Sequence, residues 1–226
     1  MKSAPRLIAR VIRHLRRHSG GAAMVEFALT APFFLGASLW GLEVGNYALA
    51  NMKVNQLAAH IADNASRVGD TSTLQNRKIF EEDINDLFIG ANIQGGSSLD
   101  FLAHGNAIIS SLEVWDSTIH KGNAHNDGDQ FISWQRCKGS LAAPSHYGVQ
   151  NDAKPLGIGP VGEEVTAIPG SAAIFVELQY DYQPLFSNRF ISTTRINSTA
   201  AFVVRDLRDQ TGIRKRKGTT NASLCP

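Results

Sequence analysis

An apolar segment near the N-terminus, residues 21–42, constrains this chain more than any other feature. Six basic residues and no acidic residue precede it: Lys2, Arg6, Arg10, Arg13, Arg16 and Arg17. About twenty apolar residues in a helix are enough to cross a hydrocarbon core of about 30 Å. A basic block beside such a segment keeps the preceding residues in the cytoplasm. We therefore expect one transmembrane helix, with the rest of the chain on the far side of the membrane.

A plain membrane anchor does not explain Glu26. A carboxylate at membrane depth costs about 2.5–3.5 kcal/mol on insertion scales, so such a residue is treated first as functional. Its candidate partner is the amine that peptide-bond cleavage after Gly21 would create on Ala22. An α-amino group ordinarily has a pKa of about 8, so this one is mostly cationic at neutral pH. The alternative is a glutamate near the membrane boundary whose side chain extends to the headgroups.

The residues around Glu26 resemble a known processing site. The run from Gly21 to Phe27, GAAMVEF, is similar to the G-x-x-x-x-E-F/Y site of type IV prepilins and pseudopilins. Residues 20–32 resemble the start of TadE/TadG-like proteins of bacterial tight-adherence (Flp) pilus systems. The resemblance implies that residues 1–21 are a cytoplasmic leader, that a prepilin peptidase cuts after Gly21, and that Glu26 acts in assembly or packing.

The likeness continues more weakly along the chain. Residues 133–137, 176–185 and 201–206 resemble segments of TadE-like periplasmic domains, in the same order. Each segment is short, and together they extend the resemblance over most of the chain.

Charge divides the leader from the rest of the chain. Six basic residues in the leader, against a net charge of +2 for all 226 residues, leave −4 on residues 22–226. The sequence pI of about 8.6 therefore comes from the leader, and we expect no nucleic-acid partner. We divide the chain into a leader (1–21), a long helix whose first half is transmembrane (22–68), and a periplasmic α+β domain with its own core (69–226).

Hydrophobic periodicity predicts an α+β fold with an antiparallel sheet, and the resemblance implies that this fold is pilin-like. Pro32 lies inside the long helix, and we expect it to kink or loosen that helix. A second helix is predicted at Thr73–Ile89, with Gly90 ending it. Extended segments are predicted at residues 99–104, 108–116, 131–137, 172–182 and 192–205. Residues 139–171, rich in Gly and Pro, are expected to be irregular.

The only two cysteines are Cys137 and Cys225. In an oxidising compartment such a pair is expected to form one disulfide, which would tie the C-terminal tail to the domain. Closing so long a loop contributes about 4–5 kcal/mol in chain-entropy theory. Two unrelated thiols remain the alternative.

No catalytic motif is present: there is no G-x-S-x-G, P-loop, H-E-x-x-H or C-x-x-C pattern. We therefore expect no catalytic residues, no cofactor and no enzymatic activity. The best metal candidates are His120, His125, Asp127 and Asp129, but their spacing matches no defined ligand set. We interpret them as a solvated hairpin turn and expect no metal site. The basic residues 214–217 are interpreted as an exposed tail.

Together these observations favour a non-enzymatic minor pilin or pseudopilin of the inner membrane, with a cytoplasmic N-terminus and a periplasmic C-terminal domain, or associated with a pilus outside the cell. The resemblance implies three kinds of partner: other pilins or pseudopilins, the pilus assembly platform and a prepilin peptidase. Two alternatives stay open. One is an uncleaved single-pass protein with a periplasmic binding domain. The other is a secreted hydrolase whose signal peptide is cut near Ala48-Leu49-Ala50.

Overall fold

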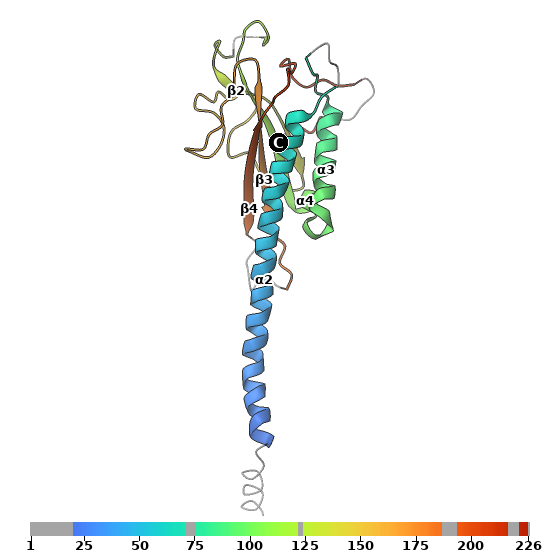
Figure 1. Cartoon of the computed structure of the whole chain (residues 1–226), viewed down its shortest axis with the longest axis vertical. Coiled ribbons are helices and arrows are strands. Elements are labelled where there is room, and N and C mark those ends of the chain that lie inside the picture. The colour runs from blue at the N-terminus through green and yellow to red at the C-terminus, as the bar shows by residue number, and fades with distance from the viewer. Residues whose placement is uncertain (1–19, 71–75, 122–123, 187–193, 217–221, 226) are drawn as a thin grey trace, which may run out of the picture. The chain divides into compact units, whose positions relative to one another are not determined.

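The computed structural model describes residues 20–70, 76–121, 124–186, 194–216 and 222–225. Its elements are α2 (Gly20–Arg67), α3 (Glu81–Leu99), α4 (Phe101–His104), β1 (Gly105–Val114), β2 (Gln130–Gly139), β3 (Ala172–Asp181) and β4 (Arg195–Val203) (Figure 1). Two compact units divide the described residues: 20–46 with 184–186, and 47–183 with the described residues from 194 onward. The α+β class predicted from the sequence is confirmed, with a long apolar N-terminal helix followed by a domain that holds an antiparallel sheet.

Helix α2 is continuous over 48 residues and continues through Pro32. Its surroundings change along its length. From residue 50 onward, small and branched apolar side chains recur every three or four positions and are buried: Ala50, Val54, Leu57, Ala58, Ile61, Ala62 and Ala65. This spacing places them on one face of the helix. The C-terminal part of α2 therefore has an apolar face that belongs to the core of the second unit, where it lies beside α3 (Figure 1).

The C-terminal end of α2 is capped by a side chain from far along the chain. Nη2 of Arg208 donates to the carbonyl oxygens of Ala65, Ser66 and Val68 at 3.2, 3.1 and 2.9 Å. The last carbonyl groups of a helix lack partners inside the helix and carry a partial negative charge, which a guanidinium complements. Burial lowers the pKa of Arg208 to about 10.

The sheet has four antiparallel strands in the order β2-β1-β3-β4. The central strands β1 and β3 are buried along almost their whole length, so both faces of the sheet are covered. On one face, Phe101 of α4 stacks on Tyr180 and Tyr47 of α2 meets Tyr182 edge-on, with ring centroids 6.1 and 5.1 Å apart. The sheet is thus enclosed between helices on this face and irregular chain on the other.

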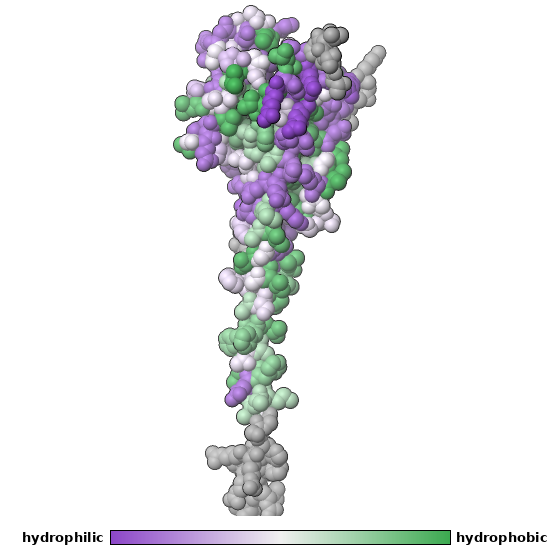
Figure 2. Space-filling model, in the orientation of Figure 1, coloured by the Kyte–Doolittle hydropathy of each residue, from purple (hydrophilic) through white to green (hydrophobic). Residues whose placement is uncertain are grey.

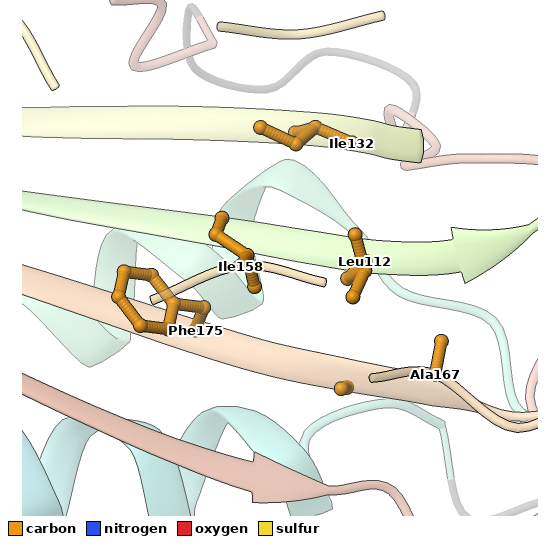
Figure 3. Close-up of a cluster of buried hydrophobic side chains, with 6 residues drawn as sticks. Leu112, Ile132, Ile158, Ala167 and Phe175 are labelled. Atoms are coloured by element: carbon orange, nitrogen blue, oxygen red, sulfur yellow. The ribbon is translucent and has the colours of Figure 1, made fainter. Parts of the chain in front are cut away.

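The irregular segment between β2 and β3 covers the second face. Two of its residues, Ile158 and Ala167, pack on side chains from three strands: Leu112, Ile132, Ala173 and Phe175 (Figure 3). Leu112 pairs with both Ile132 and Ala173 across the sheet, which places these side chains on the same face. As expected, residues 140–171 form no helix and pair only through isolated bridges.

The second helix differs from the prediction at both ends. Residues 76–80 form no helix, and Arg77 and Phe80 bridge to Arg208 and Arg214, so α3 begins at Glu81; residues 73–75 of the predicted helix lie outside the described residues. Phe80 N–H donates to the carboxylate of Asp83, which fixes this start. Gly90 does not end the helix, because one glycine in a helix costs only about 1 kcal/mol relative to alanine. The helix instead bends at Gly96, where φ is 68°, and ends at Leu99.

The short strand predicted at residues 99–104 is wrong. Leu99 ends α3, Asp100 takes a left-handed conformation with φ of 38°, and residues 101–104 form the single turn α4. The ring of Phe101 is fully buried, which holds this turn against the sheet. Six residues are too few for periodicity to separate a strand from a helical turn.

The C-terminal segment is tied to the domain at several points. Cys137 and Cys225 form a disulfide, and Cys137 N–H donates to the carbonyl oxygen of Ser223 at 2.8 Å. Residues 214–216 are exposed, as expected, and the backbone of Arg214 also exchanges hydrogen bonds with Ile79 and Glu81. Lys217, the last residue of the predicted basic tail, lies outside the described residues.

Candidate functional site

The N-terminal part of α2 presents an unusual amount of apolar surface. Figure 2 shows mostly apolar residues on the visible side of this part of the helix, with one hydrophilic residue near its lower end. Its large apolar side chains are more than half exposed: Met24, Val25, Phe27, Leu29, Phe33, Phe34, Leu35, Trp40 and Leu42. A patch of this kind marks a surface that contacts lipid or other proteins. By length and composition, α2 is a candidate membrane-spanning helix.

The four predicted processing residues occupy the first two turns of this helix. Gly21, Ala22, Glu26 and Phe27 are all exposed. Ala22 and Glu26 are four positions apart, so they lie on the same face, one turn from each other. Among the described residues, the Glu26 carboxylate has no hydrogen bond or ion pair. Glu26 and Ala22, the predicted new N-terminus, thus lie on one exposed face of the helix. The leader before Gly20 lies outside the described residues.

A second acid, Glu43, follows the apolar segment and is completely buried. Its two carboxylate oxygens accept the backbone N–H groups of Leu185 and Phe186, both at 3.1 Å. These hydrogen bonds give both oxygens a donor, which a carboxyl group that burial has removed from water requires. Sequence reasoning did not find this contact. The only local signal is an acid directly after the apolar run, and the partners are more than 140 positions away.

The predicted metal candidates do not come together. Nε2 of His120 lies 3.3 Å from the Glu113 carboxylate, whereas His125 contacts the rings of Trp115 and Phe131. Asp127 and Asp129 each accept hydrogen bonds within the loop, from Ser117 and Asn126. Among the described residues, no three His, Cys, Asp or Glu side chains are placed to hold a metal ion.

The interpretation of this turn as solvated is wrong for His120, which is only 9% exposed. Its ring stacks on Trp115 with the centroids 5.1 Å apart. Asp116 N–H donates to Nδ1, which leaves the proton on Nε2, facing Glu113. The turn is therefore anchored by one buried histidine, whereas residues 124 and 126–129 are exposed as expected.

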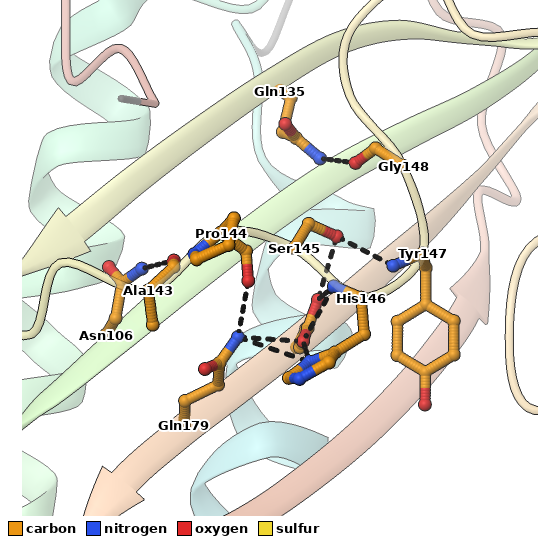
Figure 4. Close-up of polar contacts among 10 residues, drawn as sticks. Asn106, Gln135, Ala143, Pro144, Ser145, His146, Tyr147, Gly148 and Gln179 are labelled. Carbon is orange, nitrogen blue, oxygen red and sulfur yellow. Dashed lines mark hydrogen bonds and ion pairs between the residues drawn. The ribbon is translucent and has the colours of Figure 1, made fainter.

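A polar cluster on the sheet bears on the hydrolase alternative. Glu177 of β3 is 1% exposed, and it accepts hydrogen bonds from the Ser145 hydroxyl at 2.8 Å and from the backbone N–H of His146 at 3.1 Å (Figure 4). The His146 ring also contacts this carboxylate, and Gln179 donates to it at 2.9 Å. In a catalytic triad the serine donates to the imidazole, whereas Ser145 donates to the acid. The cluster fastens the irregular segment to the sheet.

Comparison with known protein families bears on the long helix. Residues 21–67 match the family model described as TadE-like protein. These residues coincide with α2, which begins at Gly20 and ends at Arg67. A search of curated proteins and a search of solved structures each found no match. The helix that carries the exposed apolar surface is therefore similar to the TadE-like family over residues 21–67.

Proposed function

We propose that this chain is a non-enzymatic minor pilin or pseudopilin that takes part in assembly of a tight-adherence (Flp, type IVb) pilus or a related secretion apparatus. In this proposal a prepilin peptidase removes residues 1–21 by cutting after Gly21. The mature protein begins at Ala22. Residues 22–68 then form the membrane and assembly helix, and residues 69–226 form a periplasmic domain.

The observation that carries the proposal is the coincidence of the TadE-like match with the geometry of α2. The match begins at residue 21, at the glycine of the predicted cleavage site. One turn further on, Glu26 presents a carboxylate with no partner among the described residues, on a helix surface that is otherwise apolar. An acid in such a place is costly unless a cation meets it. The α-amino group of Ala22, from the same chain or a neighbouring one, supplies that cation after cleavage.

The exposed apolar face of α2 supports the expected partners. While the protein is in the inner membrane, lipid covers this face. In an assembled fibre, the helices of neighbouring pilins or pseudopilins replace the lipid. Small residues allow close helix contact, and Gly36, Gly41 and Gly45 have open space where a side chain would lie. The proposed partners are therefore other pilins, the assembly platform that delivers them and the prepilin peptidase.

The proposal is tested by replacing Glu26 with Ala in the host. Glu26→Ala removes the acid without adding a polar group at membrane depth, so we expect normal membrane insertion and impaired incorporation into the pilus. Thr30→Ala is the matched control, because Thr30 is also exposed and polar and lies one turn away on α2. Normal incorporation of Glu26→Ala would contradict the assigned role.

A further inference from the structure

The contact between Glu43 and the segment after β3 fixes a short piece of chain against α2. Glu43 lies in the same compact unit as residues 184–186. Both oxygens of its fully buried carboxylate are used, by the N–H groups of Leu185 and Phe186 at 3.1 Å each. Because two hydrogen bonds hold adjacent amides to one side chain, this turn is held at the level of Glu43 on the helix.

The level of Glu43 is set by the apolar segment before it. Residues 22–42 form about 30 Å of helix at 1.5 Å per residue, which matches a hydrocarbon core. Trp40, 55% exposed, lies one turn before Glu43. Tryptophan is enriched where the acyl chains meet the headgroups. With residues 21–42 in lipid, Glu43 and the turn bonded to it lie at that boundary, on the side opposite the basic leader.

The turn has the properties of a segment that enters this boundary. Leu185 and Phe186 are large apolar side chains that are 61% and 47% exposed. A backbone donor that enters lipid must be satisfied within the protein. Here the N–H groups of both residues bond to Glu43, and Pro184, directly before them, has no N–H to satisfy. The sequence Pro-Leu-Phe thus presents apolar side chains with no unsatisfied backbone N–H.

We propose that Leu185 and Phe186 insert into the interfacial layer of the phospholipid bilayer, as a second membrane contact beside α2. Glu43 is a positioning residue for this contact, because its carboxylate holds the turn at the depth where two apolar side chains meet acyl chains. The interaction surface requires only that α2 crosses the membrane. It does not depend on cleavage after Gly21 or on entry into a pilus.

The test is tryptophan quenching by brominated lipid. The full chain is reconstituted in phosphatidylethanolamine and phosphatidylglycerol vesicles, with Trp40→Phe removing the emitter in α2. The remaining Trp115 and Trp134 are buried and give a constant background. Phe186→Trp is compared with Val161→Trp, a control at an apolar position that is 98% exposed and lies outside the turn bonded to Glu43. We expect lipids brominated near the headgroup end of their acyl chains to quench the added emission of Phe186→Trp and not that of Val161→Trp.

A further change tests the positioning role. Adding Glu43→Gln to Phe186→Trp keeps the size of the side chain but replaces one of the two accepting oxygens with an NH2 donor, so one of the two amides is released and quenching falls. Equal emission of Phe186→Trp and Val161→Trp in brominated vesicles would overturn the proposal. A second result would also overturn it: no quenching with this chain alone, together with a blue shift of the Phe186→Trp emission only when other pilins are present. That result would assign the surface to a protein partner. None of these measurements depends on cleavage after Gly21. The proposed membrane contact can therefore be wrong while the pilin assignment holds, and the reverse is also true.

Discussion

Nη2 of Arg208 lies 2.9 Å from the carbonyl oxygen of Val68, directly beyond the last residue of α2. The same nitrogen also reaches the carbonyl oxygens of Ala65 and Ser66. A residue that follows β4 thus closes the end of the N-terminal helix. The contact joins the part of α2 that lies in the second unit to the C-terminal segment of the chain.

Arg208→Met is expected to lower the free energy of unfolding by about 1–3 kcal/mol, because it leaves buried helix-end carbonyls without a donor. The measurement is thermal unfolding of the full chain in detergent, followed by near-ultraviolet circular dichroism. Arg205→Met is the control, since Arg205 is exposed and only three positions away. Equal stability of the two variants would show that the cap is unimportant.

A buried ion pair holds the start of α3 to β2. Nε of Arg136 lies 2.9 Å from Oε2 of Glu81, and the two side chains are 9% and 3% exposed. Arg136→Met leaves the Glu81 carboxylate buried without its cation, and we expect it to cost about 3–5 kcal/mol. The double variant Glu81→Met/Arg136→Met removes both charges and is expected to be more stable than Arg136→Met alone. A double variant that is less stable than the single one would contradict this account.

The disulfide holds the C-terminal segment at the edge of β2. Replacing both Cys137 and Cys225 with Ala is expected to lower stability by about 2–5 kcal/mol. Trypsin cleavage after Arg214 or Arg216 should also become faster, because the segment loses its covalent attachment. Mass spectrometry of a timed digest measures this effect, with the unchanged chain as reference. Equal digestion rates before and after the substitution would mean that the backbone hydrogen bonds alone hold the segment.

The pair of Asp181 and Arg195 predicts a small dependence of stability on pH. Arg195 Nε donates to Asp181 at 2.7 Å, and this hydrogen bond lowers the pKa of Asp181 below its ordinary value of 3.8. A lowered folded-state pKa gives stability that is present above the unfolded-state value and is lost as the pH falls through the folded-state value. Because Arg195 is 42% exposed, solvent screens the pair, and we expect at most about 1 kcal/mol.

Melting temperatures of the unchanged chain and of Asp181→Asn, measured from pH 7 to pH 2, test this prediction. The difference between the two proteins should be largest at neutral pH and should vanish once Asp181 is protonated in the folded state. A difference that grows as the pH falls would have the wrong sign.

The parts of the fold that follow from a long or strongly apolar pattern could be predicted from the sequence. The end of the long helix near residue 68 and the strand beginning at Ala172 follow from periodicity sustained over many residues. The boundaries of α3 could not be predicted, because Gly90 resembles a stop signal and only packing shows that the helix continues. For the same reason, residues 99–104 looked like a strand although Phe101 is anchored in a helical turn.

The candidate site shows the same division between local and distant information. Gly21, Ala22, Glu26 and Phe27 form a local motif, so their common place at the start of one helix could be predicted. The contact of Glu43 with Leu185 and Phe186 could not be predicted, because the donors are backbone N–H groups. Almost every residue type has such a group, so the sequence does not show which residues supply it. The burial of His120 could not be predicted for a related reason, since Asn, Asp and Gly around it indicate a turn but not which of its side chains pack inward.

The central claim is that a peptidase separates Gly21 from Ala22, so that Glu26 meets a newly formed amine. The most direct measurement is N-terminal sequencing of the protein purified from the membranes of its host, in which the prepilin peptidase is active. The account predicts a mature chain that begins Ala22-Ala23-Met24. A chain that still begins at Met1 would support an uncleaved anchor, and one that begins near Asn51 would support secretion, and either result would contradict the account.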